Sequence, residues 1–425
     1  MRRSPGVSTN ISRRKPIPTL TSFAKVCAEL DRRRHVTLGF ERIEALLDAM
    51  GHPERDIPNL VQVVGTNGKG TTAVALASAL VEMGYPSGAY LSPHVLSYTE
   101  RVVVRGRQVS EEEFAAAMGE TIDLADRHGI PVSQFEILTA GTLGVFAEAG
   151  LSWAVLEAGL GARYDATSVA GSDAVVLTNV SLDHTEYLGE TVEEITAEKL
   201  ASLRPGATLF LGTDDRRVVD IASRECHRLG ASLVQIGDER EGMSSLVPYA
   251  ARDVHLGLAV AEHLLDRTIP AGIQEKVAHD TGAALPGRFE AHEVDGVPVV
   301  VDGGHNAAGV AAAVAAVRSA YGRRPLGVVF GVLREKDAAS MLKGLGGDSH
   351  VIVLTRPESE RACDPALVER EHGPLDGKGR RALIVHDPVE ALGVAVEAVR
   401  DVAGVILVTG SLSTAAPVLR RLREA

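Results

Sequence analysis

Short runs of Val, Ile and Leu alternate along this chain with longer stretches in which Ala, Leu and Glu recur at helical spacing. This alternation is typical of an α/β protein in which helices cover a mostly parallel sheet. The pattern occurs twice, because a second and smaller series of apolar runs follows the first. We expect strands at Leu60–Val64, Trp153–Glu157, Ala174–Thr178 and Thr208–Gly212, and then within VPVVVDGGHN, PLGVVFGV, HVIVLTR, ALIVHD and GVILVTGS.

The chain length also favours two domains, since 425 residues exceed the usual size of one domain. We expect the seam within Thr281–Glu290 (TGAALPGRFE), where Gly and Pro interrupt the regular patterns and permit a hinge. The first residues are basic and rich in Ser and Pro but lack the apolar core of an export signal. The predicted organisation is a disordered leader at 1–20, a first domain at 21–284 and a second domain at 285–425.

Charge and composition narrow the range of partners. The formal net charge of −12 argues against a nucleic-acid-binding surface and against attraction to anionic lipid. No apolar run approaches the roughly 18 residues of a membrane helix, and the three cysteines lack the spacing of metal ligands or of a disulfide framework. We therefore expect a cytoplasmic monomer whose partners are small molecules, with no nucleic acid and no membrane.

The segment from Val63 to Thr72, VVGTNGKGTT, has the parts of a phosphate-binding loop. Glycines allow close approach of backbone N–H groups to an anion, a lysine reaches the terminal phosphates, and a helix begins directly afterwards. In the standard motif, four residues separate the first Gly from the Gly-Lys pair, and Ser or Thr follows the Lys. Here only two residues separate Gly65 from Gly68, and Gly70 follows Lys69. From the residues alone, the alternative is a tight glycine turn between a strand and a helix.

This variant loop resembles that of the folylpolyglutamate synthase and dihydrofolate synthase family, within the wider group of Mur-type amide ligases. Further blocks are similar to the family in the same order, from about Leu38 to the C-terminus: LGFERIEALLDAMG, SPHVLSYTERVVVRG, FEILTAGTLGVF, LEAGLGARYDATS, LDHTEYLG, AEKLASLRPG, LPGRFE, VVDGGHN, GVLREKD and VTGSLSTA. The resemblance implies a P-loop ATPase-type first domain with a mostly parallel sheet and a smaller, Rossmann-like second domain.

Such ligases use ATP to phosphorylate a carboxylate, and an amino group then attacks the acyl phosphate to give an amide and ADP. This chemistry requires charge neutralisation and placement more than a strong acid or base. By resemblance, the ATP phosphates would lie on Gly65, Thr66, Asn67, Gly68, Lys69, Gly70, Thr71 and Thr72. One or two Mg²⁺ ions, which prefer hard oxygen ligands, would be held at Ser92, Glu157 and His184.

Two of the implied residues also stand out from the pattern alone. Glu157 ends an apolar strand, where a carboxylate is costly unless it is paired or bound to metal. Lys199 follows a capping box formed by Thr191 and Glu194, and it falls on the inward stripe of the predicted helix. A desolvated lysine tends to lose its charge, and by resemblance Lys199 is expected to be carbamylated and to help hold the metal. The alternative is a lysine whose stem is buried and whose tip reaches solvent.

The resemblance places further residues on both sides of an interdomain cleft. Arg288 and Asp302 match nucleotide-contacting positions, whereas His305 and Ser411 match family residues near the cleft. Ser411 is also an expected ATP contact. The resemblance implies a catalytic set of Lys69, Lys199, His184, Asp302 and His305. Their positions at predicted strand ends suit a site at the carboxyl edge of a sheet. The expected contacts to the acid substrate are Thr37, Leu38, Gly39, Phe40, Phe135, Glu136, Ile137, Leu138, Arg163, Tyr164 and Asp165.

Several positions depart from the family's pattern. Ala162, Tyr164 and Ser168 replace the usual Gly, Leu and Asn, and His255 stands where the family has an asparagine that contacts ATP. Three hypotheses follow: transfer of L-glutamate to a pterin or folate-like acid, ligation of another acid and amine on the same fold, and non-catalytic ATP binding. The set Lys69, Glu157, His184 and Lys199 favours catalysis, and Tyr164 leaves the acceptor acid open.

Overall fold

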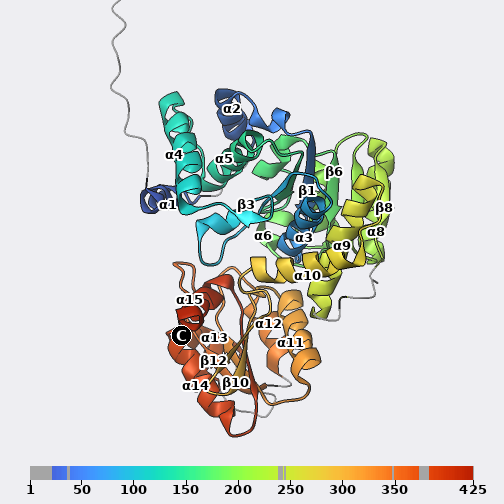
Figure 1. Ribbon diagram of the computed structural model, residues 1–425. Helices are drawn as coiled ribbons and strands as arrows, with labels where there is room; N and C mark the ends of the chain where they lie inside the picture. Colours follow the sequence, from blue (N-terminus) through green and yellow to red (C-terminus); the bar gives the residue numbers. More distant parts are fainter. Residues whose placement is uncertain are drawn as a thin grey trace, which may run out of the picture.

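The computed structural model describes residues 22–35, 39–237, 243, 246–346, 349–372 and 382–424. Within these ranges the chain forms two α/β units, each built on its own sheet, which lie one above the other in Figure 1. The predicted fold of two successive α/β units is confirmed. The predicted leader and two expected substrate contacts, Thr37 and Leu38, lie outside the described residues.

The first sheet contains eight strands: β1 (Asn59–Val64), β2 (Ser87–Tyr90), β3 (Val102–Val104), β4 (Arg107–Gln108), β5 (Trp153–Glu157), β6 (Ala174–Leu177), β7 (Thr208–Leu211) and β8 (Ser232–Gln235). Their order is β4-β3-β2-β5-β1-β6-β7-β8; β3 runs antiparallel to both of its neighbours, β2 and β4, and the other pairs are parallel. Buried side chains of β1 alternate between the two faces, as strand geometry requires. Both faces must therefore be covered.

Helices supply that cover. On one face α3 (Lys69–Glu82), α9 (Pro248–Leu265) and α10 (Ala271–Ala284) pack over Val61 and Val63. On the other face Leu60 and Val64 are covered by α1 (Phe23–Arg32), α2 (Glu41–Met50), α4 (Glu111–His128), α5 (Gln134–Glu148), α7 (Val192–Lys199) and α8 (Arg216–Leu229). The short α6 (Thr185–Leu188) precedes α7.

The second sheet contains six strands: β9 (Glu290–Val294), β10 (Val297–Val301), β11 (Leu326–Phe330), β12 (Ser349–Leu354), β13 (Leu383–Ile384) and β14 (Val405–Thr409). Their order is β13-β12-β11-β14-β10-β9, and only β9 runs antiparallel to its neighbour. One face packs on α11 (Ala307–Tyr321), α12 (Ala338–Gly346) and α13 (Pro365–His372), and the other on α14 (Pro388–Arg400) and α15 (Leu412–Glu424).

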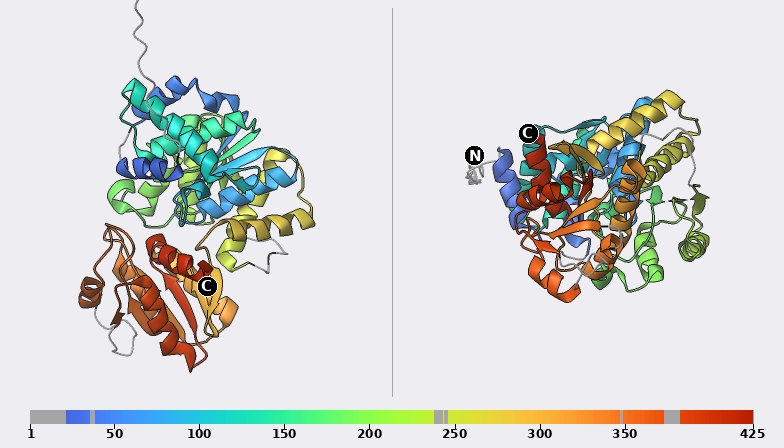
Figure 2. Two further views of the ribbon diagram at one scale, coloured as in Figure 1. Left: turned by 60° about the vertical axis from the view of Figure 1, so that its left-hand side comes forward. Right: turned by 90° about the horizontal axis from the view of Figure 1, so that it is seen from below.

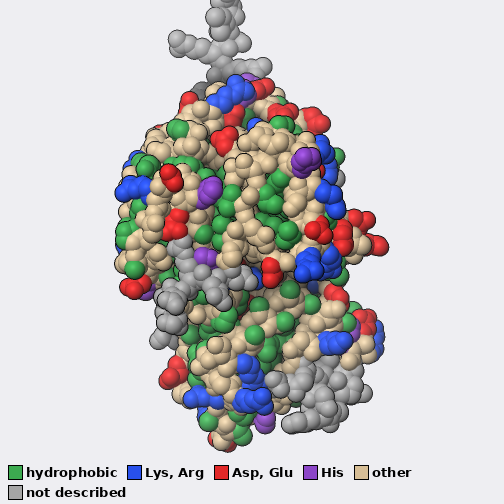
Figure 3. Space-filling model, turned by 90° about the vertical axis from the view of Figure 1, so that its right-hand side faces the viewer, with side chains coloured by type: hydrophobic (Ala, Val, Ile, Leu, Met, Phe, Trp, Pro, Cys, Tyr) green, Lys and Arg blue, Asp and Glu red, His purple; other side chains and the backbone are tan. Residues whose placement is uncertain are grey.

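The carboxyl ends of both sheets face each other. The loops after β1 and β6 contact the loops after β10 and β11, for example through an ion pair between Asp183 and Lys336. Figures 1 and 2 show the two units meeting along this line. On the face drawn in Figure 3, acidic and basic side chains are interspersed over both units. None of the helices in the described ranges is long and apolar enough to cross a bilayer.

Candidate active site between the two sheets

The loop after β1 is a close-fitting turn that leads directly into α3. Gly65 has φ 147° and Gly68 has φ 83°, values that favour glycine. A Cβ at Gly65 would lie 1.9 Å from Thr178 Oγ1, and one at Gly68 would lie 2.3 Å from a carboxylate oxygen of Asp253. The loop therefore requires glycine at both positions, and it delivers the N-terminus of α3, with its free N–H groups, to the sheet edge.

Neighbouring strands hold this loop in place. Asn67 N donates to Asn179 Oδ1 at 3.1 Å, while Asn179 Nδ2 and Thr178 Oγ1 donate to the Asn67 carbonyl at 2.8 and 2.7 Å. Lys69 bends back so that its Nζ donates to the Thr66 carbonyl at 3.3 Å. Because so many of its own groups are paired to the loop after β6, the turn is pre-organised for an anion.

Glu157, at the end of β5, lies against this loop. A Cβ at Gly70 would be 3.2 Å from Glu157 Oε2, so the carboxylate approaches the backbone of the loop directly. The same oxygen accepts from Ser92 N at 2.8 Å. Burial raises the pKa of Glu157, and Lys69 opposes that rise. The Oγ of Ser92 is buried and has no hydrogen-bond partner among the described residues.

Lys199, the last residue of α7, reaches the other side of the same loop. The capping box of Thr191 and Glu194 that starts α7 is confirmed. The helix ends at Lys199, and the predicted inward orientation of the lysine is confirmed. Lys199 is 4% exposed, and its Nζ donates to the Gly65 carbonyl at 2.8 Å. Burial, and then the charge of Lys69, lower its pKa to about 7.

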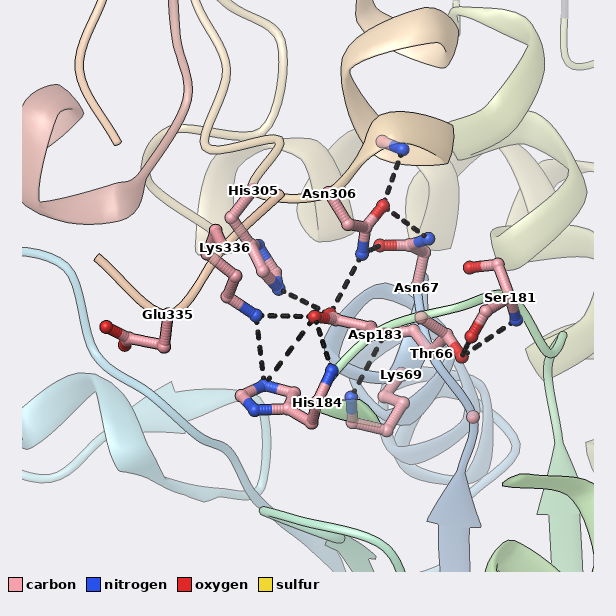
Figure 4. A network of polar contacts seen from close by, with 12 residues as sticks. Thr66, Asn67, Lys69, Ser181, Asp183, His184, His305, Asn306, Glu335 and Lys336 are labelled. Carbon is pink, nitrogen blue, oxygen red and sulfur yellow. Dashed lines mark hydrogen bonds and ion pairs between the residues drawn. The ribbon is translucent and has the colours of Figure 1, made fainter. Parts of the chain in front are cut away.

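A second cluster joins the two sheets around Asp183 (Figure 4). Its carboxylate accepts from Lys336 Nζ at 2.6 Å and from Asn306 Nδ2 at 3.0 Å, and it lies 3.5 Å from His305 Nε2. Burial alone would raise the pKa of Asp183, but His305 and Lys336 hold it well below its usual range. The residue is thus an ionised anchor of the first sheet for three side chains from the second.

His184 and Asn306 extend this cluster toward the phosphate loop. His184 Nε2 lies 3.1 Å from Lys336 Nζ, and burial followed by the charge of Lys336 lowers the pKa of the ring to about 4. Asn306 caps α11 through Gly309 N, and its amide exchanges hydrogen bonds of 3.1 and 3.3 Å with the amide of Asn67. Asn306 therefore connects the second unit to the phosphate loop itself.

A third group surrounds Asp302, at the end of β10. Its carboxylate accepts from Gly304 N at 2.9 Å, from Phe289 N at 3.0 Å and from the hydroxyl of Tyr249 on α9. Arg288, next to Phe289, acts electrostatically on Tyr249, Asp253 and Glu157. Its guanidinium charge is thus directed toward the phosphate loop.

The hydroxyl group of Ser411 forms its hydrogen bonds at the start of α15 and not with the residues of these clusters. Its Oγ accepts from Thr414 N at 3.1 Å and lies 2.8 Å from Thr414 Oγ1, so it caps the first turn of α15. His255, on α9, is 2.8 Å from the Gly237 carbonyl through its Nε2. Its ring is thus directed to the loop after β8.

The expected substrate segments lie around the carboxyl end of β5 and the loop that follows it. Phe135 lies against Gly159, with its ring centroid 5.8 Å from that of Tyr90, and Tyr164 is exposed beside Phe40 at 6.4 Å between centroids. Among the other side chains, Ile137 and Leu138 are fully buried in the core. Two charged residues form ion pairs, Glu136 with Arg42 at 3.1 Å and Arg163 with Glu198 at 2.8 Å. The carboxylate of Asp165 accepts hydrogen bonds from the N–H groups of Gly159 and Leu160. Gly39 directly precedes Phe40.

Five residues of these clusters were not singled out from the sequence: Asp183, Tyr249, Asp253, Asn306 and Lys336. Asp183, Asn306 and Lys336 lie inside the quoted blocks LDH, GGHN and REKD, and the first two adjoin the named residues His184 and His305. Asp253 had a signal of its own, because it shares the buried face of α9 with Leu256, Gly257 and Val260. Tyr249 carried no comparable signal.

Each of the two units matches a domain of known proteins. Residues 63–243 match the middle domain of Mur ligases, and residues 287–412 match their glutamate ligase domain. The Escherichia coli dihydrofolate synthase/folylpolyglutamate synthase is 32% identical over 73% of this chain and 75% of its own length. A Mycobacterium tuberculosis folylpolyglutamate synthase complexed with ADP superposes with TM-score 0.83 at 27% identity, covering 95% of this chain and 99% of its own.

A third similar structure is a bifunctional folylpolyglutamate synthase/dihydrofolate synthase solved with Mn, AMPPNP and L-glutamate, with TM-score 0.81, 27% identity, and coverage of 96% and 100%. The two sheets, together with the match of each unit to a Mur ligase domain, define an ATP-dependent ligase of the Mur type. Within that class, the chain belongs to the dihydrofolate synthase/folylpolyglutamate synthase family.

Proposed function

We propose that this enzyme couples L-glutamate to a pterin or folate-like acid, namely dihydropteroate, a folate polyglutamate or both, with ATP as the source of energy. The observation that carries the proposal is the convergence of the phosphate loop, Glu157, Lys199 and the Asp183 cluster between the two sheets. ATP would lie on the loop from Gly65 to Thr72. The relative solved with AMPPNP and L-glutamate supports these substrates.

The donor groups near the loop fit a magnesium ion. Within the described ranges no three His, Cys, Asp or Glu side chains gather as a metal site on their own. Ser92 Oγ, however, is buried without a partner beside a carboxylate whose ionisation burial disfavours, and such a pair suits a hard cation that also binds phosphate oxygens. Ser92, Glu157 and His184 would hold one or two Mg²⁺ ions, which would neutralise phosphate charge during transfer.

Lys199 would take part as a carbamate. Its amine is buried against the Gly65 carbonyl, and the lowered pKa leaves a substantial neutral fraction near pH 7, the form that adds CO₂. The resulting anion would supply oxygen ligands where an ammonium cannot. Electron density at Lys199 in crystals grown with bicarbonate tests this, and a bare ammonium at high resolution would contradict it.

The remaining residues would position the reactants. Lys69 would leave the Thr66 carbonyl for the phosphates, and Arg288 with Asp302 would bring the nucleotide from the second domain to the loop. His305 lies beside Asp183, and Lys336 lies beside His184; the acid and the amine would meet near these side chains. The reaction gains chiefly from orientation and from fixed charge at the developing phosphate. Ser411, an expected ATP contact, would contribute by holding the first turn of α15 in place beside the nucleotide.

An ADP-release assay with the purified protein tests the substrate assignment. Dihydropteroate, tetrahydrofolate and unrelated carboxylic acids are offered with a panel of amino acids. We expect turnover only with a pterin-containing acid and L-glutamate. Turnover with another acid and amine, and none with any pterin, would favour the second hypothesis; Tyr164, exposed beside Phe40, is the residue that motivates including it. Nucleotide binding without any substrate-stimulated ADP release would favour a non-catalytic role.

Replacement of Lys69 tests the loop. Lys69→Ala removes a charge that lies on the loop and is only weakly engaged in the fold, through one hydrogen bond of 3.3 Å. We expect turnover to fall at least a hundredfold, while the circular dichroism spectrum and the unfolding midpoint stay unchanged. Retained activity would refute the assignment of this loop to ATP.

A further inference from the structure

A buried carboxylate lies against the loop that is proposed to bind polyphosphate. Asp253, in the second turn of α9, is 3% exposed, and both of its carboxylate oxygens lie within 2.5 Å of the position that a Cβ on Gly68 would occupy. Thr72 Oγ1 donates to the Asp253 carbonyl at 3.1 Å, which holds this turn of α9 on the first turn of α3. The carboxylate is therefore fixed beside an anion site.

Few positive charges surround Asp253. On α9, Arg252 Nη2 donates to its carboxylate at 3.3 Å, while the hydroxyl of Tyr249 is directed to Asp302. Arg288 attracts it from the segment before β9. On the facing loop and first turn of α3, from Gly65 to Thr72, the charged residue is Lys69, which is bonded to the Thr66 carbonyl. Burial raises the pKa of Asp253 to about 6 in spite of Arg252.

We propose that Asp253 takes up a proton when a nucleotide polyphosphate binds to the loop, so that nucleotide binding is coupled to protonation of this carboxylate. The proposal rests on the proposed function, because it needs the nucleotide on the loop. A polyphosphate brings negative charge to the backbone that Asp253 already touches, and like charges favour the neutral form of a carboxyl group. The same phosphates compete with Asp253 for Arg288 and thereby remove part of what keeps it ionised.

The coupling has a definite sign. A group that is protonated more fully in the complex makes binding weaker as pH rises from its pKa in the free protein to its pKa in the complex. With a free-state pKa of about 6 and a rise of roughly one to one and a half units on binding, affinity falls about five- to twelvefold from pH 6 to pH 8. At pH 7 binding then takes up roughly half a proton.

Calorimetry measures both quantities. Mg-ADP is titrated into the full-length protein at pH 6, 7 and 8, in buffers of low and high ionisation enthalpy, so that the difference in heat gives the protons bound. Wild type is expected to lose affinity and to take up protons as stated. In Asp253→Asn, which keeps the shape without the charge, both effects should shrink to the part that Lys199 contributes from the other side of the loop, and affinity at pH 8 should exceed that of wild type. Asp266→Asn, at the other end of α9, is the control and should behave as wild type.

A second variant keeps the carboxylate and does not depend on the stability of Asp253→Asn. Because Arg252 lowers the pKa of Asp253, Arg252→Gln should move the loss of affinity to higher pH. Equal proton uptake in wild type and Asp253→Asn, or an unmoved pH profile in Arg252→Gln, would overturn the proposal while leaving nucleotide binding intact. If wild type does not bind Mg-ADP at any pH, the proposed function fails instead.

Discussion

At the residue scale, three buried ionisable side chains lie around one loop: Glu157, Lys199 and Asp253. Each is at most 6% exposed, and burial is the largest influence on each pKa. Such groups lower stability unless a partner compensates them. If the proposed function holds, the ligands of the reaction would supply these partners.

Lys199→Met tests this conflict between stability and function. Burial lowers the pKa of Lys199 from 10.5 to about 7. Below pH 7 the amine is protonated in both the folded and the unfolded state, so the buried ammonium costs the folded free protein about 3 to 5 kcal/mol. Loss of its hydrogen bond to the Gly65 carbonyl offsets about 1 kcal/mol of the gain. At pH 6, without bicarbonate or metal, we expect the variant to melt several degrees higher than wild type and to be inactive.

The pH dependence supplies the control. The cost of Lys199 is complete below pH 7 and shrinks as pH rises toward 10.5, so the advantage of Lys199→Met in urea unfolding should be smaller at pH 9 than at pH 6. A variant that is less stable than wild type at pH 6 would show that the lysine stabilises the fold.

At the element scale, local pattern predicted much of the first sheet. The strand at Trp153–Glu157 has the predicted bounds, and three others differ by one residue at an end. Helix α2 is capped by Gly51, whose backbone is in the left-handed conformation that is common after the last residue of a helix. These features could be predicted because strand alternation and helix capping depend on residues a few positions apart.

Contacts between distant segments could not be predicted in this way. Asp183 meets Lys336 across 153 positions, and Asn67 meets Asn306 across 239. No periodicity links such pairs, because their proximity depends on how the second sheet is placed against the first. Asp253 is a different case, since the reasoning that identified Lys199, a charge on an inward helical stripe, applies to it equally.

A pair of glycines at the two ends of α3 tests how the loop is built. Gly68 and Gly84 both have positive φ, 83° and 90°, but a Cβ at Gly84 meets nothing within 4 Å, whereas one at Gly68 meets the Asp253 carboxylate. We expect Gly84→Ala to lower the free energy of unfolding by about 1 kcal/mol, and Gly68→Ala by several times more, with loss of Mg-ADP binding. Equal losses in urea unfolding would show that the carboxylate does not restrict the loop.

At the scale of the whole molecule, the two domains are joined by the cluster around Asp183. The side chains of Asp183 and Lys336 are each 7% exposed, so their ion pair is largely removed from solvent. The removal of one partner from a buried pair costs about 3 to 5 kcal/mol. Because the partners belong to different sheets, that cost falls on the arrangement of the domains.

Lys336→Met should therefore loosen the molecule without unfolding either domain. We expect a larger radius of gyration in small-angle X-ray scattering and a calorimetric transition that separates into two. Arg400→Gln removes an exposed ion pair of similar length within the second domain, 2.7 Å to Asp295, and should change neither by a measurable amount. An unchanged radius and a single transition in Lys336→Met would mean that the cluster does not hold the domains together.

The segment between α10 and β9 determines what moves if the domains rotate. Gly303 N donates to the Gly287 carbonyl at 2.8 Å, and Phe289 N donates to the Asp302 carboxylate at 3.0 Å. The connecting chain is thus bonded to the second sheet from Gly287 onward, which leaves Leu285 and Pro286 between α10 and these bonds as the expected pivot. Arg288 precedes β9 in the sequence, yet it would move together with the second domain. A nucleotide bound to Arg288 and Asp302 would then move with that domain as one rigid body and reach the loop with its orientation already set.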